Sequence, residues 1–138
     1  MQVYKSILVT IDCSPVDEAI LQHVAALALQ NSAQVCLLHV VHSHTLDQDR
    51  TLRATAEAAM KTYCESLSAQ GVAVHSLIRS GEPEKEILAE IGGHGYDLVA
   101  MATHGHAFLG DILFGSLSDK LKHTISVPLL LIKAGRRP

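Results

Sequence analysis

The sequence predicts a doubly wound α/β domain, with one five-stranded parallel sheet in the order 3-2-1-4-5 and helices on both faces. Short runs of β-branched and other apolar residues alternate with longer segments in which apolar residues recur at helical spacing. A regular alternation of strand and helix implies parallel pairing through right-handed crossovers. The predicted strands are also almost uninterruptedly apolar, which is typical of a sheet that helices cover on both faces.

Strand-like runs predict the sheet. They occupy residues 6–11, 34–41, 72–79, 97–103 and 127–132. The third run alternates only in part, which suits an edge of the sheet.

Segments of helical period lie between these runs. The first follows turn residues at 12–15 and spans 16–30, and the second follows an irregular polar stretch at 42–50 and ends at Gly71. Gly81 and Pro83 open a short third helix. A fourth helix is expected to begin near Ser116.

Composition excludes several classes of protein. Hydrophobic residues make up 48% of the 138 residues and charged residues 18%, so the chain is not disordered. No apolar run approaches the about 20 residues that cross a bilayer, so we expect no membrane insertion. Eleven basic and fourteen acidic residues give a net charge of −3, which disfavours nucleic acid as a partner. Three widely spaced cysteines and an N-terminus that leads straight into a strand predict a cytoplasmic protein.

A doubly wound sheet binds ligands outside the carboxyl ends of the strands at which the winding reverses. In the predicted order these are the first and fourth strands, followed by residues 12–15 and 103–115. Asp12 ends the first strand and can accept hydrogen bonds from a ribose hydroxyl or an adenine amine.

The second loop contains Gly105, and Gly115 precedes Ser116. Ser116 with Asp119 resembles a capping box, so we expect free backbone N–H groups there that bind an anion. Taken alone, a glycine before a serine-capped helix is explained equally well by ordinary turn chemistry.

Taken together, these residues resemble the universal stress protein family, and the resemblance covers residues 1–138 as one domain. The matching motifs are Asp12 with Ser14-Pro15, Leu38-His39-Val40, Gly81-Glu82-Pro83, Tyr96-Asp97-Leu98-Val99, Ala102-Thr103-His104-Gly105, Gly115-Ser116 and Val127-Pro128-Leu129-Leu130. Members that bind ATP carry Gly-x-x-Gly, nine residues, then Gly-Ser or Gly-Thr. This chain keeps the second glycine, the nine-residue spacer and the final pair, whereas Ala102 replaces the first glycine.

The resemblance implies ATP as the ligand, with Mg²⁺ arriving on the nucleotide. It implies that Asp12 and the backbone of Val40 hold the adenosine. It places around the phosphates Ala102, Gly105, His106, Gly115, Ser116 and Ser118. It also implies a homodimer formed through the last strand, 127–132, whose apolar edge needs a partner.

The phosphate loop departs from the family pattern at three positions. The methyl group of Ala102 crowds a phosphate or the ribose if it faces the ligand. His106 stands where Arg or Lys is common, and histidine, with a pKa of about 6.5, supplies little positive charge at neutral pH. Phe108 stands where a further glycine is frequent.

Other chemistries fit the sequence less well. The histidines include His39, His42 and His44, but no spacing of Cys or carboxylates completes a metal set, so no dedicated metal site is expected. Neither a Gly-x-Ser-x-Gly elbow nor a Walker loop is present, and Cys13 beside Asp12 should have a raised pKa.

The expected function is a dimeric, ATP-binding stress sensor or regulator that is not an enzyme. A dimeric interaction module of the same fold that binds no nucleotide, and a slow ATPase, stay open as alternatives.

Overall fold

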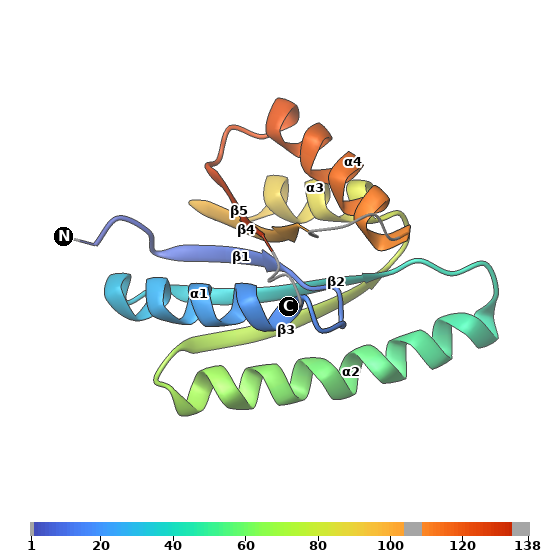
Figure 1. The fold of residues 1–138 in the computed structure, drawn as a ribbon, viewed down its shortest axis with the longest axis horizontal. Coiled ribbons are helices and arrows are strands. Elements are labelled where there is room, and N and C mark those ends of the chain that lie inside the picture. The colour runs from blue at the N-terminus through green and yellow to red at the C-terminus, as the bar shows by residue number, and fades with distance from the viewer. Residues whose placement is uncertain (1, 104–108, 134–138) are drawn as a thin grey trace, which may run out of the picture.

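The computed structural model describes residues 2–103 and 109–133, with the backbone alone for 109–116. In chain order its elements are β1 (Ser6–Thr10), α1 (Asp17–Asn31), β2 (Gln34–Val41), α2 (Leu46–Ala69), β3 (Ala73–Ser80), α3 (Pro83–Gly93), β4 (Leu98–Thr103), α4 (Leu109–Thr124) and β5 (Leu129–Lys133). The strands form one sheet in the order β3-β2-β1-β4-β5, and every pairing is parallel (Figure 1). The predicted fold class and strand order are confirmed.

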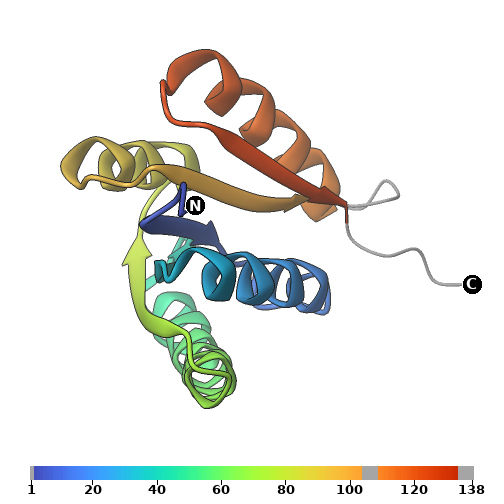
Figure 2. The same ribbon diagram turned by 90° about the vertical axis from the view of Figure 1, so that its left-hand side faces the viewer.

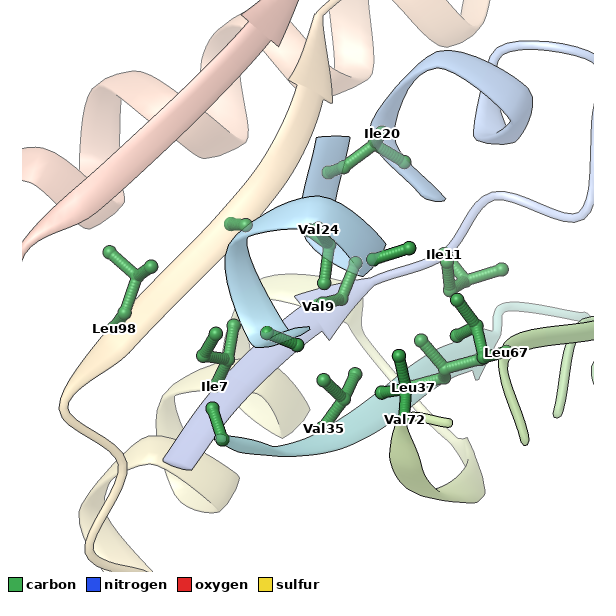
Figure 3. Close-up of a cluster of buried hydrophobic side chains, with 14 of the residues drawn as sticks. Ile7, Val9, Ile11, Ile20, Val24, Val35, Leu37, Leu67, Val72 and Leu98 are labelled. Carbon is green, nitrogen blue, oxygen red and sulfur yellow. The ribbon is translucent and has the colours of Figure 1, made fainter. Parts of the chain in front are cut away.

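Helices cover both faces of this sheet, α1 and α2 on one and α3 and α4 on the other (Figures 1 and 2). Because side chains alternate across a strand, β1 contributes to two separate cores. Ile7 and Val9 pack with α1 and α2 (Figure 3), whereas Leu8 packs with α3 and α4. All three are fully buried, and each such side chain contributes about 1.5–3 kcal/mol to folding. Alternation in the central strand thus fixes both helical layers.

Local signals set most of the helix ends. Ser32 caps α1 in the left-handed conformation at φ 50°, and Gly71 follows α2 at φ 94°. Pro83 is the first residue of α3, a position at which a backbone N–H would have no partner within the helix, so the N–H that proline lacks is not needed there. None of the helices in the described ranges combines the length and apolar character needed to span a bilayer.

The expected irregular stretch at 42–50 is partly wrong, because α2 already begins at Leu46. Thr45 caps this helix by accepting a hydrogen bond from the Gln48 N–H at 3.0 Å. Asp47 and Asp49 lie in the first turn, where acidic residues interact favourably with the helix dipole. The segment is polar because this end of α2 faces solvent, not because it is irregular.

The predicted start of α4 near Ser116 is also wrong, because the helix begins at Leu109. Apolar residues at 109, 112 and 113 continue the helical period of Leu117 upstream of Ser116. Gly110 and Gly115 weaken the helical signal of this segment, yet a glycine inside a helix costs only about 1 kcal/mol. Ser116 therefore lies inside α4 and does not cap it.

Candidate functional site

A cavity of about 300 Å³ lies at the carboxyl ends of β1 and β2. Its described lining consists of Thr10, Ile11, Asp12, Cys13, Leu38, His39, Val40, Val41, His42, Leu52, Thr55, Ala56, Pro83, Ile87 and Leu117. The volume is at the lower end of the range for ligand pockets, about 300–1,000 Å³. The cavity opens at the predicted edge of the sheet. Its described lining comes from the ends of β1 and β2, however, and includes no residue of β4, the second strand at which the winding reverses.

The turn between β1 and α1 is organised by Asp17, which is 1% exposed. Its Oδ1 accepts from the Asp12 N–H at 2.9 Å, and its Oδ2 accepts from the Ser14 N–H at 3.2 Å. The hydroxyl of Tyr63 on α2 also donates to Oδ2, at 2.9 Å. One buried carboxylate thus ties the turn that carries Asp12 to a helix on the same face of the sheet.

Burial shifts the pKa values of groups in this turn. It raises the pKa of Asp17 above its ordinary value, although the hydrogen bonds that the carboxylate accepts oppose the shift. Burial, with the charges of Asp17 and Asp12, raises the pKa of the Cys13 thiol to about 12. The expected raised pKa of Cys13 is confirmed, so the thiolate that redox chemistry needs is scarce at neutral pH.

Asp12 keeps one carboxylate oxygen available. The Ser14 hydroxyl donates to Asp12 Oδ2 at 2.6 Å, which fixes the orientation of the carboxylate. Its other oxygen, Oδ1, accepts no hydrogen bond from the residues that the structure describes. Asp12 can therefore accept a hydrogen bond from a hydroxyl or amine in the cavity.

His39 and Val40 supply further polar groups from β2. The Nδ1 of His39 lies 2.7 Å from the Ile11 carbonyl oxygen, so Nδ1 carries the hydrogen and Nε2 of the neutral ring is an acceptor. The Leu38 carbonyl accepts from the Ile11 N–H at 2.8 Å, the last such bond along this edge of β2. Val40 lies two residues further along β2, so its N–H and C=O point to the same side of the strand as those of Leu38. The pairing of β1 with β2 ends before Val40, at Thr10 and Leu38.

Ala102 does not line the cavity. It is 6% exposed and belongs to the hydrophobic core on the α1 side of the sheet. The methyl group of Ala102 is therefore not part of the described wall of this cavity.

The remaining expected phosphate contacts lie on α4 or outside the described residues. Gly105 and His106, with Phe108, lie outside the described residues. Ser118 is on α4 and is partly exposed, and it is not among the residues that line the cavity. Gly115 and Ser116 lie inside α4, beyond its first four residues, whose N–H groups have no partner within the helix. The expectation of free amides beside a serine cap is therefore wrong for this structure.

The sequence-based argument missed Thr10 and Asp17. Thr10 is a polar residue at the end of an otherwise apolar strand, and it is 4% exposed. Asp17 is the last residue of Ser14-Pro15-Val16-Asp17, a pattern in which a carboxylate reaches back to the N–H three residues earlier. The start of α1 therefore carries the same kind of capping signal as Ser116 with Asp119.

The histidines near the cavity do not form a metal set. His42 and His44 lie edge to face with ring centroids 5.6 Å apart, and His42 Nδ1 contacts the Gly81 carbonyl at 3.2 Å. Across residues 2–103 and 109–133, no three His, Cys, Asp or Glu side chains are grouped to hold an ion.

Comparison with known proteins identifies the family. The family model "Universal stress protein family" matches residues 3–133. Universal stress protein MJ0577 of Methanocaldococcus jannaschii is 26% identical over 154 residues, which cover 94% of this chain and 95% of that protein. A universal stress protein of Thermus aquaticus is 30% identical, covering 94% of this chain and 99% of its own length.

Solved structures agree with this assignment. The structure of MJ0577 superposes with a TM-score of 0.82 at 28% identity, covering 97% of this chain and 99% of that one. A universal stress protein in complex with cAMP gives 0.76 at 14% identity, covering 97% and 100%. The universal stress protein of Archaeoglobus fulgidus in complex with dAMP gives 0.73 at 19% identity, covering 96% and 100%. The last two are too distant in sequence to show more than the shared fold. The family match over residues 3–133 places this chain in the universal stress protein family.

Proposed function

We propose that the chain binds an adenine nucleotide, with ATP as the leading candidate, and acts as a dimeric stress sensor or regulator without efficient catalysis. The observation that carries this proposal is the cavity at the ends of β1 and β2, where Asp12 and His39 line an otherwise largely apolar space. Among the described residues, none donates a hydrogen bond to Asp12 Oδ1. Two proteins with the same fold have been solved with cAMP and with dAMP, which supports this class of ligand.

The residues of the cavity fit a nucleoside. Asp12 Oδ1 and the Val40 backbone provide hydrogen-bonding groups suited to the hydroxyls of a ribose. Leu38, Ile87 and Leu117 provide aliphatic surface suited to the faces of a purine base. A triphosphate is too polar for such surface and would extend out of the cavity toward the connection between β4 and α4, with Mg²⁺ bound to it.

Contact between the phosphates and Gly115 or Ser116 requires a change in α4, because the N–H groups there belong to the helix. Gly110 and Gly115 each make the helix less stable by about 1 kcal/mol than alanine would, so its first turns unwind at low cost. Nucleotide binding should therefore speed amide hydrogen exchange at residues 113 and 114, whose N–H groups lie beyond the first four of the helix, while it protects residues 12–14. Unchanged exchange in α4, with ATP bound, would remove Ser116 and Gly115 from the site.

Sequence features support the rest of the proposal. Charged groups that stabilise a phosphoryl-transfer transition state are lacking from the motif, which favours binding without turnover. β5 is an edge strand on which Leu131 is 44% exposed, and pairing with a second copy would cover it. The net charge of −3 disfavours nucleic acid, and a cytoplasmic location accords with three unpaired cysteines.

A second candidate is an interaction module of the same fold that binds no nucleotide and acts through its dimer surface. The helical state of Gly115 and Ser116 favours it, because those amides are not free. The two candidates differ in one property that is simple to measure, which is affinity for ATP.

Titration calorimetry with ATP tests the proposal directly. The wild-type protein should bind, Asp12→Ala should bind on the order of tenfold or more weakly, and Asp47→Ala, an exposed acidic residue on α2, should bind like the wild type. No heat at millimolar ATP would favour the interaction module. Nucleoside diphosphate accumulating over hours, and lost in Asp12→Ala, would instead establish a slow ATPase.

A further inference from the structure

Cys13 adopts a strained backbone conformation in the middle of the turn between β1 and α1. Its φ of 61° is left-handed, a region that residues with a Cβ rarely adopt. The N–H groups on either side of it, those of Asp12 and Ser14, both donate to the carboxylate of Asp17. A conformation of this kind persists only where surrounding contacts hold it, so the Asp17 carboxylate maintains the shape of the turn.

Tyr63, on α2, fixes that carboxylate from outside the turn. Its hydroxyl donates to Asp17 Oδ2 at 2.9 Å, and the same oxygen accepts from the Ser14 N–H at 3.2 Å. Among the hydrogen bonds of the described residues, this is the one that joins α2 to the turn. Tyr63 is not among the described residues that line the cavity, and it lies instead at a groove between α1 and α2. Any effect that it has on a ligand in the cavity is therefore transmitted through Asp17.

The series of contacts that starts at Tyr63 ends at the carboxylate of Asp12. The Ser14 hydroxyl donates to Asp12 Oδ2 at 2.6 Å, so the position of Ser14 sets the orientation of that carboxylate. The backbone N–H of Asp12 is held by Asp17 Oδ1 at 2.9 Å. Both the backbone and the side chain of Asp12 thus depend on one buried carboxylate, which Tyr63 in turn orients.

We infer that Tyr63 is a positioning residue, which sets the affinity of the cavity for a nucleoside by holding the Asp17 carboxylate and, through it, Asp12. This inference rests on the proposed function, in which Asp12 binds the ribose. Without the hydroxyl, the turn has the correct shape in a smaller fraction of the molecules, and the apparent affinity falls in proportion to that fraction. Ligand binding at the ends of β1 and β2 is thereby coupled to α2.

Tyr63→Phe tests the inference, and Tyr96→Phe is its matched control. The Tyr96 hydroxyl also donates to a buried carboxylate, that of Glu90 at 2.7 Å, but on the opposite face of the sheet. Calorimetry, at a temperature at which all variants are folded, would use ATP and adenosine as probes. Tyr63→Phe should weaken the binding of both by the same factor, about threefold to tenfold. Tyr96→Phe should bind both as the wild type does, because Asp12 is untouched.

A double-mutant cycle with Asp12→Ala separates positioning from a general loss of stability. If Tyr63 acts through Asp12, Tyr63→Phe should have no further effect on the affinity for ATP once the Asp12 carboxylate is removed. A merely structural role would weaken binding by the same factor in Asp12→Ala as in the wild type.

The outcomes separate this inference from the function on which it rests. The positioning role is refuted, and the nucleotide site survives, if Tyr63→Phe binds ATP as the wild type does or if Tyr96→Phe is weakened equally. It is also refuted if the effects of Tyr63→Phe and Asp12→Ala multiply. If the wild type binds neither ATP nor adenosine, the proposed function fails and the inference fails with it.

Discussion

Replacing Asp17 by asparagine tests how the turn that carries Asp12 is held. The carboxylate accepts three hydrogen bonds, at 2.9, 3.2 and 2.9 Å, from two backbone N–H groups and the Tyr63 hydroxyl. An amide has one acceptor oxygen, so its NH₂ group must face at least one of these donors. Leaving a buried donor unpaired costs about 1–3 kcal/mol, and the remaining bonds lose the strengthening that a charge provides. We expect Asp17→Asn to lower the free energy of unfolding by about 2–4 kcal/mol.

Thermal unfolding, followed by circular dichroism, measures this loss. For a domain of this size it corresponds to a fall in melting temperature of roughly 6–16 °C. Tyr63→Phe removes a single donor and should cost less, about 1–2 kcal/mol. Asp47→Asn makes the same change at an exposed position in the first turn of α2 and should cost no more than about 0.5 kcal/mol. If Asp17→Asn and Asp47→Asn have the same melting temperature, the Asp17 carboxylate does not organise the turn.

Three further predictions follow from the structure. The folded-state pKa of Asp17 is raised, so the stability that this shift contributes is fully present below the unfolded value of about 3.8 and declines as pH rises through the folded pKa. The difference in urea midpoint between wild type and Asp17→Asn should therefore grow from pH 7 to pH 4. A difference that shrinks over this range would contradict the raised pKa. Gly81 has φ 147°, and a Cβ there would lie 3.0 Å from Glu86 Oε2, so Gly81→Ala should lower the free energy of unfolding by about 1–2 kcal/mol. Gly92 is the control, because no atom lies within 4 Å of a Cβ built there. Gly92→Ala, in α3, should raise the free energy of unfolding by about 0.5–1 kcal/mol. Equal effects of Gly81→Ala and Gly92→Ala would refute the strain at Gly81. Leu131→Asp should convert the proposed dimer to a monomer, as measured by light scattering after size exclusion, because the residue is exposed on edge strand β5. The far-ultraviolet circular dichroism spectrum should stay unchanged. A dimer that persists would place the interface elsewhere.

The sheet was predictable because its signal is strong and repeated. In β2 the consecutive residues 35–38 are all buried, so both faces of the strand are covered. The alternation of such strands with helical segments admits few topologies. The starts of α2 and α4 were not predictable in the same way. Both are polar or glycine-containing at their N-terminal ends, and tertiary context makes them helical although local propensity is weak.

The site was predictable in part for a related reason. Topology placed Asp12 at the carboxyl end of the first strand, and the family resemblance added Val40 of the second strand. The structure shows both beside the cavity. Thr10 was missed because a single polar residue at the end of an apolar strand carries no distinct signal. The amides of Gly115 were wrongly expected to be free because a Gly-Ser pair is compatible with both a helix start and a helix interior.

Mapping ATP onto the protein by chemical-shift perturbation of backbone amides tests the central claim most directly. The account predicts saturable shifts at residues 10–14 and 38–42, which surround the cavity. A second groove, of about 470 Å³, lies between α1 and α2 and is lined by residues including Leu21, Thr62 and Gln70. Shifts confined to that groove, or no shifts at millimolar ATP, would contradict the assignment of the nucleotide site to the ends of β1 and β2.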